Sequence, residues 1–253
     1  PSGYILWVAI ADVAKYVTQG SDLDAEALKR GNSTYFSDLV VPMLPEALSN
    51  NICSLIEGEV RAALVVKIWL NESGQKTSHT FFRSIIKNRM ACSYNEIQCV
   101  IDASDGFKTN IELLKILKPI HAAYKLLAKK TQEREPLELE LIEQDILFDS
   151  FGEITEVKSK ERLEAHKIVE EFMIIANICA AETIQKNKLS FLYRVHEPPC
   201  REKLINLKTL AKSLGASLNT GSRITGGSLN NLLKIAKQDN CNELVSMTIL
   251  RAM

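Results

Sequence analysis

Two adjacent glutamates lie inside an apolar helical pattern, and their chemistry needs an explanation. Glu170 and Glu171 stand within the run KIVEEFMIIAN, where most neighbours are apolar. We expect one of the two carboxylates to face inward, and a buried carboxylate needs a partner or a functional role. Neighbouring side chains on a helix point about 100° apart, so the pair cannot easily share one metal ion.

An aromatic pair in a segment punctuated by prolines is the second candidate. Tyr35 and Phe36 follow the turn-forming residues Asn-Ser-Thr, and Pro42 and Pro45 exclude a helix from the segment after the pair. The pattern predicts a fixed, partly buried loop that holds an aromatic ring in a defined place. The residues alone leave two roles open for Tyr35, which are packing beside Phe36 or presenting its ring to a ligand.

The other groups that could bind metal or phosphate lack the spacing of known motifs. The six cysteines form no CxxC pair, and no HExxH motif contains any of the four scattered histidines, His79, His121, His166 and His196. The glycine-rich stretch 220–228 could place a phosphate at a helix N-terminus, but a plain helix cap explains it better. Cys179 lies in an apolar run, where a reduced core thiol is favoured, and this indicates a reducing compartment.

The periodicity of the apolar residues predicts an α+β fold with a mixed sheet and a buried central helix at 162–188. The segments 61–70 and 76–87 flank the turn signal NESGQ and predict a β-hairpin. Further strands are expected at 1–10, 137–144, 154–159 and 190–197. Further helices are expected at 21–31, 95–103, 111–134, 201–214, 228–238 and 242–253.

The composition is that of an ordinary globular protein. Of the 253 residues, 46% are hydrophobic and 25% are charged, and Lys+Arg and Asp+Glu both number 31. This balance disfavours non-specific nucleic-acid binding by bulk charge, although a local basic groove is compatible with it. No apolar run is long enough to span a membrane, and we expect no membrane partner.

Four ordered stretches resemble the RNB-type catalytic domain of the ribonuclease II and ribonuclease R family of exoribonucleases, and the ribonuclease R branch is the most similar. They are WVAIADVAKYVTQGSDLDAEALKRGNSTYFSDLVVPMLPEALSNNICSL, NRMACSYNEIQ, EAHKIVEEFMIIAN and LYRVHEPP. The resemblance implies that Tyr35 stacks on a base near the 3′ end of RNA, and that Tyr94 contacts RNA near the scissile end and helps to select ribose. It places Glu170 at the same end of the RNA channel, with Arg194 and His196 facing the phosphate path.

Several parts that the family resemblance implies are missing from the chain. The Asp-rich metal motif of the family falls before Pro1, and Asp12 matches a structural acid at a strand end. A glycine/histidine block and an arginine-bearing motif fall after the last residue, and the flanking OB-type RNA-binding domains are absent. Leu139 stands where the family often has a stacking aromatic residue. We therefore expect residues 1–253 to be the middle of one catalytic domain, truncated at both ends and without metal ligands.

By resemblance, the parent protein is a 3′–5′ exoribonuclease that hydrolyses single-stranded RNA with Mg²⁺ and releases nucleoside 5′-monophosphates. A two-metal site needs several converging carboxylates, so we expect the chain alone to be inactive. The alternative is a non-catalytic RNA-binding or scaffold protein with the same fold, and a small-molecule enzyme that uses the 220–228 loop is more distant. We expect a cytoplasmic monomer whose partner is single-stranded RNA and not DNA.

Overall fold

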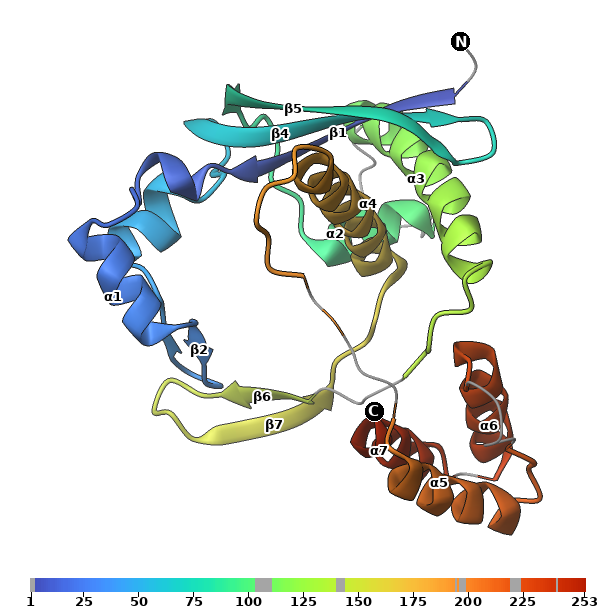
Figure 1. Ribbon diagram of the computed structural model, residues 1–253. Coiled ribbons are helices and arrows are strands. Elements are labelled where there is room, and N and C mark those ends of the chain that lie inside the picture. Colours follow the sequence, from blue (N-terminus) through green and yellow to red (C-terminus); the bar gives the residue numbers. More distant parts are fainter. Residues whose placement is uncertain are drawn as a thin grey trace. The chain divides into compact units, whose positions relative to one another are not determined.

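The computed structural model describes residues 3–102, 111–139, 144–193, 195, 199–218, 224–239 and 241–253. The chain divides into two compact units. The first unit combines Pro1–Leu127 with Asp145–Leu189, and the second combines Ala128–Gln144 with Ser190–Met253. The first unit contains both helices and strands, whereas the described elements after residue 190 are helices (Figure 1). The predicted α+β class is therefore confirmed.

An antiparallel sheet of three strands organises the first unit. Its strands occur in the order β1 (Gly3–Ala11), β4 (Val60–Asn71) and β5 (Lys76–Lys87). β4 and β5 form the predicted hairpin, and the register places Val66 between Val8 of β1 and Phe81 of β5. The hairpin turn contains Gly74 at a φ of 76°, a left-handed conformation that glycine adopts without steric cost.

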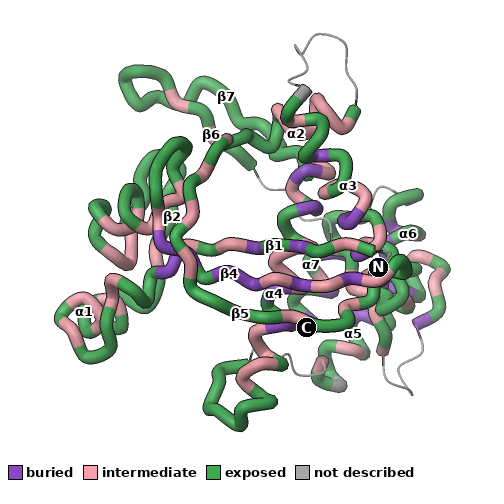
Figure 2. The backbone as a smooth tube through the Cα atoms, turned by 90° about the horizontal axis from the view of Figure 1, so that it is seen from above, coloured by how far each residue is buried: buried purple, intermediate pink, exposed green. Residues whose placement is uncertain are grey.

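One face of this sheet is apolar and is covered by helices α3 (Ile111–Gln132) and α4 (Glu164–Lys186), as Figure 1 shows. Side chains alternate between the two faces of a strand, so every second residue of β1 and β4 points towards these helices. Figure 2 shows the resulting line of buried residues along β4. The core cluster consists of Leu6, Val8, Val66, Ile68, Leu70, Leu127, Ala176 and Cys179.

Polar contacts also attach α4 to β5. The Nε2 atom of His79 lies 2.7 Å from Oγ1 of Thr183, and the Lys76 ammonium pairs with the Glu182 carboxylate. Burial lowers the pKa of His79, and the charge of Lys76 lowers it further. Burial also raises the pKa of the Cys179 thiol to about 11, so this thiol stays protonated and behaves as an apolar core residue.

The segment between β1 and β4 contains short elements that lie apart from the three-stranded sheet. The chain passes through a 3₁₀ turn (Val13–Lys15), α1 (Asp22–Arg30), β2 (Thr34–Tyr35), β3 (Val40–Val41) and a π-helical turn (Ala47–Ile52). Helix α1 starts where the Ser21 hydroxyl accepts a hydrogen bond from the Asp24 amide. After β5 the first unit continues with α2 (Tyr94–Ile101), and later with the hairpin of β6 (Gln144–Phe148) and β7 (Ile154–Ser159).

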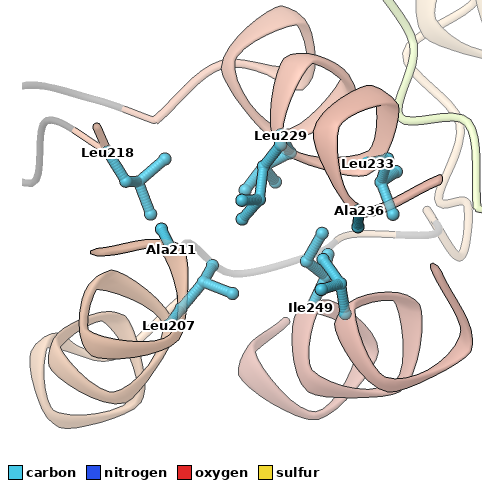
Figure 3. Packing of buried hydrophobic residues seen from close by; sticks show 9 residues of the cluster. Leu207, Ala211, Leu218, Leu229, Leu233, Ala236 and Ile249 are labelled. Carbon is cyan, nitrogen blue, oxygen red and sulfur yellow. The ribbon is translucent and has the colours of Figure 1, made fainter. Parts of the chain in front are cut away.

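The second unit has its own core between three amphipathic helices. These are α5 (Arg201–Ser213), α6 (Gly226–Gln238) and α7 (Asn242–Ala252), and Figure 3 shows their side chains meeting. The fully or nearly fully buried members of this core are Leu207, Ala211, Leu218, Leu229, Leu232, Leu233, Ala236, Val245 and Ile249. Leu139 packs against the same cluster, so it serves as a half-buried apolar contact of the helices.

Two predicted strands are wrong in the described part of the chain. Residues 137–139 are irregular, residues 140–143 lie outside the described range, and the described strand β6 comprises Gln144–Phe148. The backbone before β6 bonds to a side chain instead, because Asn230 accepts from the Glu138 amide at 2.9 Å and donates to the Pro136 carbonyl at 2.8 Å. Residues 190–193 and 195 are also irregular and do not belong to a strand.

The sheet–helix core generates a stability prediction. Ile68 is fully buried in it, whereas Ile85 on the neighbouring strand is 68% exposed. Ile68→Ala should lower the free energy of unfolding by about 2–5 kcal/mol, because it removes buried methyl groups and leaves a cavity. The matched variant Ile85→Ala should change it by about 0.5 kcal/mol or less. Urea unfolding followed by circular dichroism measures both, and equal losses would contradict the placement of the core.

Candidate functional site

Tyr94 is the first residue of α2, and the residues around it fix its backbone. The Ser93 hydroxyl accepts a hydrogen bond from the Glu96 amide at 3.2 Å, and the Glu96 carboxylate accepts from the Ser93 amide at 2.6 Å. This reciprocal pair is a capping box, which satisfies two amides that the helix leaves free. The hydrogen bonds from Ser93 lower the pKa of Glu96, so its carboxylate stays ionised at neutral pH. The capping box therefore fixes where α2 starts and holds the backbone at Tyr94.

The Tyr94 ring stacks on the imidazole ring of His166, near the start of α4. The ring centroids are 4.0 Å apart and the planes meet at 23°. Nδ1 of His166 accepts a hydrogen bond from the Leu163 amide at 3.2 Å. A neutral imidazole has one protonated nitrogen, so acceptance at Nδ1 places its hydrogen on Nε2. Tyr94 remains 45% exposed, so its ring is supported by His166 and still accessible from solvent.

Two hydrogen bonds hold the start of α4 against its neighbours in the first unit. The Gln98 side chain on α2 accepts from the Ala165 amide at 3.1 Å. Nε2 of His121 on α3 lies 3.0 Å from a carboxylate oxygen of Glu164. The helix N-terminus leaves several amides without intrahelical partners, and the amide of Ala165 is satisfied by α2. α2 and α4 therefore keep a fixed relation where Tyr94 meets His166.

One of the two adjacent glutamates was expected to face inward. Glu170, one helical turn after His166 on α4, faces solvent. Its side chain is 48% exposed and pairs with the guanidinium of Arg162, which precedes the helix. Glu171 is half-buried. Burial raises the pKa of the Tyr124 hydroxyl on α3, and so do the charges of Glu164, Glu171 and Glu170, in that order. The start of α4 thus has a concentration of negative charge, with Arg162 beside it.

Tyr35 is presented on the small hairpin of β2 and β3. Its side chain is 76% exposed, which excludes the alternative that it packs in the core beside Phe36. The amide of Phe36 donates to the Leu39 carbonyl at 2.8 Å and closes the hairpin. Two further hydrogen bonds brace the loop. The Arg30 guanidinium donates to the Pro42 carbonyl at 3.0 Å, and the Ser33 hydroxyl accepts from the Met43 amide at 2.9 Å.

The structure places the sequence-predicted residues in different situations. Tyr94 stacks on His166 at the α2–α4 junction, and Glu170 lies one helical turn further along α4. Tyr35 is on a separate hairpin of the same unit. Arg194 and His196 lie outside the described residues. Asp12 is buried and pairs with Arg83 at 3.0 Å, as expected for a structural acid at a strand end.

Two residues of this junction were missed by sequence reasoning. His166 was considered only as one of four scattered histidines, and Arg162 was given no role. The spacing between His166 and Glu170 was the available signal, because residues four apart are neighbours on one helix face. The stack with Tyr94 joins segments 72 positions apart, and no local pattern shows such a contact.

The glycine-rich stretch before α6 is explained by a helix cap and close packing. Thr225 caps the helix by accepting from the Ser228 amide at 3.3 Å. A Cβ atom on Gly226 would lie 2.0 Å from the backbone carbonyl oxygen of Glu135, so glycine is required there, and the Glu135 carboxylate lies against Gly227. The carboxylate of Glu135 thus already lies at this helix N-terminus, and it would repel a phosphate. The predicted cap is confirmed for Thr225, while residues 220–223 lie outside the described range.

Two other features are missing from the described residues, a metal-binding cluster and a membrane-spanning helix. Within them, no group of three or more His, Cys, Asp or Glu side chains is arranged to hold a metal ion. Over the same ranges, no helix combines the length and the apolar character needed to cross a membrane.

Comparisons with known proteins agree on one family. A family model for the RNB domain matches residues 1–253. Ribonuclease R of Vibrio cholerae is 34% identical over 252 residues, which are 99% of this chain and 31% of that protein. Ribonuclease R of Escherichia coli is 32% identical over 252 residues, again 99% of this chain and 31% of that protein. The chain therefore spans about a third of the length of these relatives.

Solved structures agree as well. Mycoplasma genitalium RNase R in complex with ribose-methylated single-stranded RNA is similar with a TM-score of 0.90 at 28% identity, over 100% of this chain and 40% of that one. A yeast pseudonuclease is similar with a TM-score of 0.73 at 18% identity, over 98% of this chain and 30% of that one. The second likeness concerns the fold alone.

Proposed function

The chain belongs to the RNB-domain family, and we propose that it works as part of a 3′–5′ exoribonuclease. The substrate is single-stranded RNA. The reaction adds water across the terminal phosphodiester bond, which leaves a 3′-hydroxyl on the shortened strand and releases a nucleoside 5′-monophosphate. The match of the family model to all 253 residues is the observation that supports this proposal most strongly. The likeness to a solved RNase R with bound RNA is consistent with it.

We propose that Tyr35, Tyr94 and Glu170 hold the RNA strand. Tyr35 has an exposed ring on a braced hairpin, and this suits a platform on which a base of any identity can stack. Tyr94, which stacks on His166 of α4, and Glu170, one helical turn further along α4, contact the 3′-terminal nucleotide. An ionised carboxylate accepts hydrogen bonds, so Glu170 can accept one from a ribose hydroxyl. The 2′-hydroxyl distinguishes RNA from DNA, which is why we propose that DNA is not a substrate.

Nucleases with an RNB domain are metal-dependent in general, and we propose Mg²⁺ as the ion. The described residues of this chain do not fit such a site, because they gather no cluster of carboxylates suited to it. We propose that an Asp-rich motif elsewhere in the full-length protein supplies the ligands, and that residues 1–253 form the middle of one catalytic domain. Arg194 and His196 are proposed to face the phosphate path, together with this motif.

We further propose that the protein is a cytoplasmic monomer. All six cysteines are free thiols, which suits a reducing compartment. The alternative function is a non-catalytic RNA-binding or scaffold protein. The fold is similar to that of a yeast pseudonuclease, and this similarity supports the alternative.

Incubation of the full-length protein with 5′-labelled oligoadenylate and Mg²⁺ tests the function. We expect stepwise shortening from the 3′ end and release of AMP, and EDTA should abolish both. RNA binding without shortening in any divalent metal would favour the scaffold alternative. Internal cleavage, or products with a 3′-phosphate, would contradict the proposed reaction.

The stacking role of Tyr35 predicts a loss of RNA affinity. Tyr35→Ala should weaken the binding of single-stranded RNA by about 1–3 kcal/mol, because one base loses its aromatic platform. Fluorescence anisotropy in EDTA at low salt measures the affinity without degradation. Tyr35→Phe should retain most of it. Phe151→Ala, which removes another exposed aromatic ring from the first unit, is the matched control. Unchanged affinity in Tyr35→Ala would remove Tyr35 from the RNA path.

A further inference from the structure

We propose that His166 is a positioning residue that fixes the Tyr94 ring for recognition of the terminal ribose. This inference rests on the proposed function, in which Tyr94 contacts the 3′-terminal nucleotide. The observation behind it is the stack of the two rings, with centroids 4.0 Å apart and planes at 23°. Recognition of one hydroxyl group requires a contact that is placed to within a fraction of an ångström, and an exposed side chain does not hold such a position unaided.

His166 is itself held rigidly, which a support must be. Its Nδ1 atom accepts a hydrogen bond from the Leu163 amide at 3.2 Å, so the imidazole has a fixed orientation on the helix. Its neighbours Ala165 and Ile168 are buried, and these anchor the backbone of α4 on both sides of it. The Ala165 amide is in turn bonded to Gln98 of α2, the helix that begins with Tyr94. The His166 ring and the Tyr94 ring are therefore held on two helices that are hydrogen-bonded to each other.

The stack leaves Tyr94 suited to a ligand. The ring is 45% exposed although His166 lies against one side of it. Without the imidazole, the half-exposed Tyr94 would lose its stacking partner and could adopt other side-chain rotamers. Glu170 lies four residues after His166 on the same helix face, so movement of Tyr94 would change its distance from the carboxylate that contacts the same nucleotide.

A structural role and a positioning role for His166 predict different effects of its removal. A structural residue affects stability, and any other residue that anchors α4 would have the same effect. His79 provides that comparison, because it contacts Thr183 at 2.7 Å near the other end of α4 and lies on the core side of the sheet. Loss of either histidine weakens the attachment of α4, but only loss of His166 frees the Tyr94 ring.

The test uses the full-length protein and two substrates, an oligoribonucleotide and the same strand with 2′-deoxy sugars at its last two positions. The ratio of their degradation rates gives the ribose preference. His166→Ala should reduce this preference about three- to tenfold, the range that corresponds to losing one aromatic stack. His166→Phe should restore it, because phenylalanine retains the flat ring. Tyr94→Ala should lose at least as much, and adding His166→Ala to it should cause no further loss.

The control His79→Ala should lower the melting temperature and keep the ribose preference. If His166→Ala keeps the preference while Tyr94→Ala loses it, Tyr94 recognises ribose without this support and the inference is overturned. If His166→Phe fails to restore the preference, stacking is not the means, and the inference is overturned as well. If the unmodified protein does not shorten RNA from its 3′ end, the proposed function fails, and this inference fails with it.

Discussion

Apolar packing of α4 against the inner face of the antiparallel sheet is the interaction on which the rest of the first unit depends. Ile68 and Val66 on the middle strand and Cys179 on the helix are almost completely excluded from solvent. Full burial of an aliphatic side chain contributes about 1.5–3 kcal/mol, so a few such residues fix the helix on the sheet. The antiparallel ladders keep the three strands in register and make the apolar face continuous.

The α2–α4 junction takes its geometry from this packing. With one face of α4 held by the sheet, the first turns of the helix present His166 towards Tyr94 of α2 and Glu170 towards solvent. The capping box at Ser93 fixes where α2 starts, and so where Tyr94 emerges. Tyr35 belongs to the same unit but depends on a different device, a hairpin braced by Arg30. Rigid supports with exposed rings are what a sequence-tolerant RNA site requires.

The sequence predicts the long strands and helices of the first unit, because strongly periodic segments have one stable arrangement, whereas the short strands β2, β3 and β6 were not predicted. The segment 137–144 was misassigned for a physical reason. Its alternation of leucine and glutamate is typical of a strand, yet the described leucines Leu137 and Leu139 pack on a helical core, and Asn230 bonds the backbone between them. The strand expected at 190–197 also had a plausible apolar pattern, but its described residues make no ladder.

The site is only partly visible in the sequence. Tyr35, Tyr94 and Glu170 were identified through the family resemblance, whereas their surroundings depend on contacts between distant segments. Of the two adjacent glutamates, one was expected to face inward because their neighbours are apolar, but Glu170 faces solvent. It lies about 200° around the helix from the buried Ile168, on the solvent side, where Arg162 can pair with it. The most direct test of the account is photo-crosslinking of RNA with 4-thiouridine at its 3′ end to the full-length protein in EDTA, followed by mass spectrometry. The account predicts crosslinks to peptides that contain Tyr94 or residues 162–170. Crosslinks confined to residues 201–253 would contradict it.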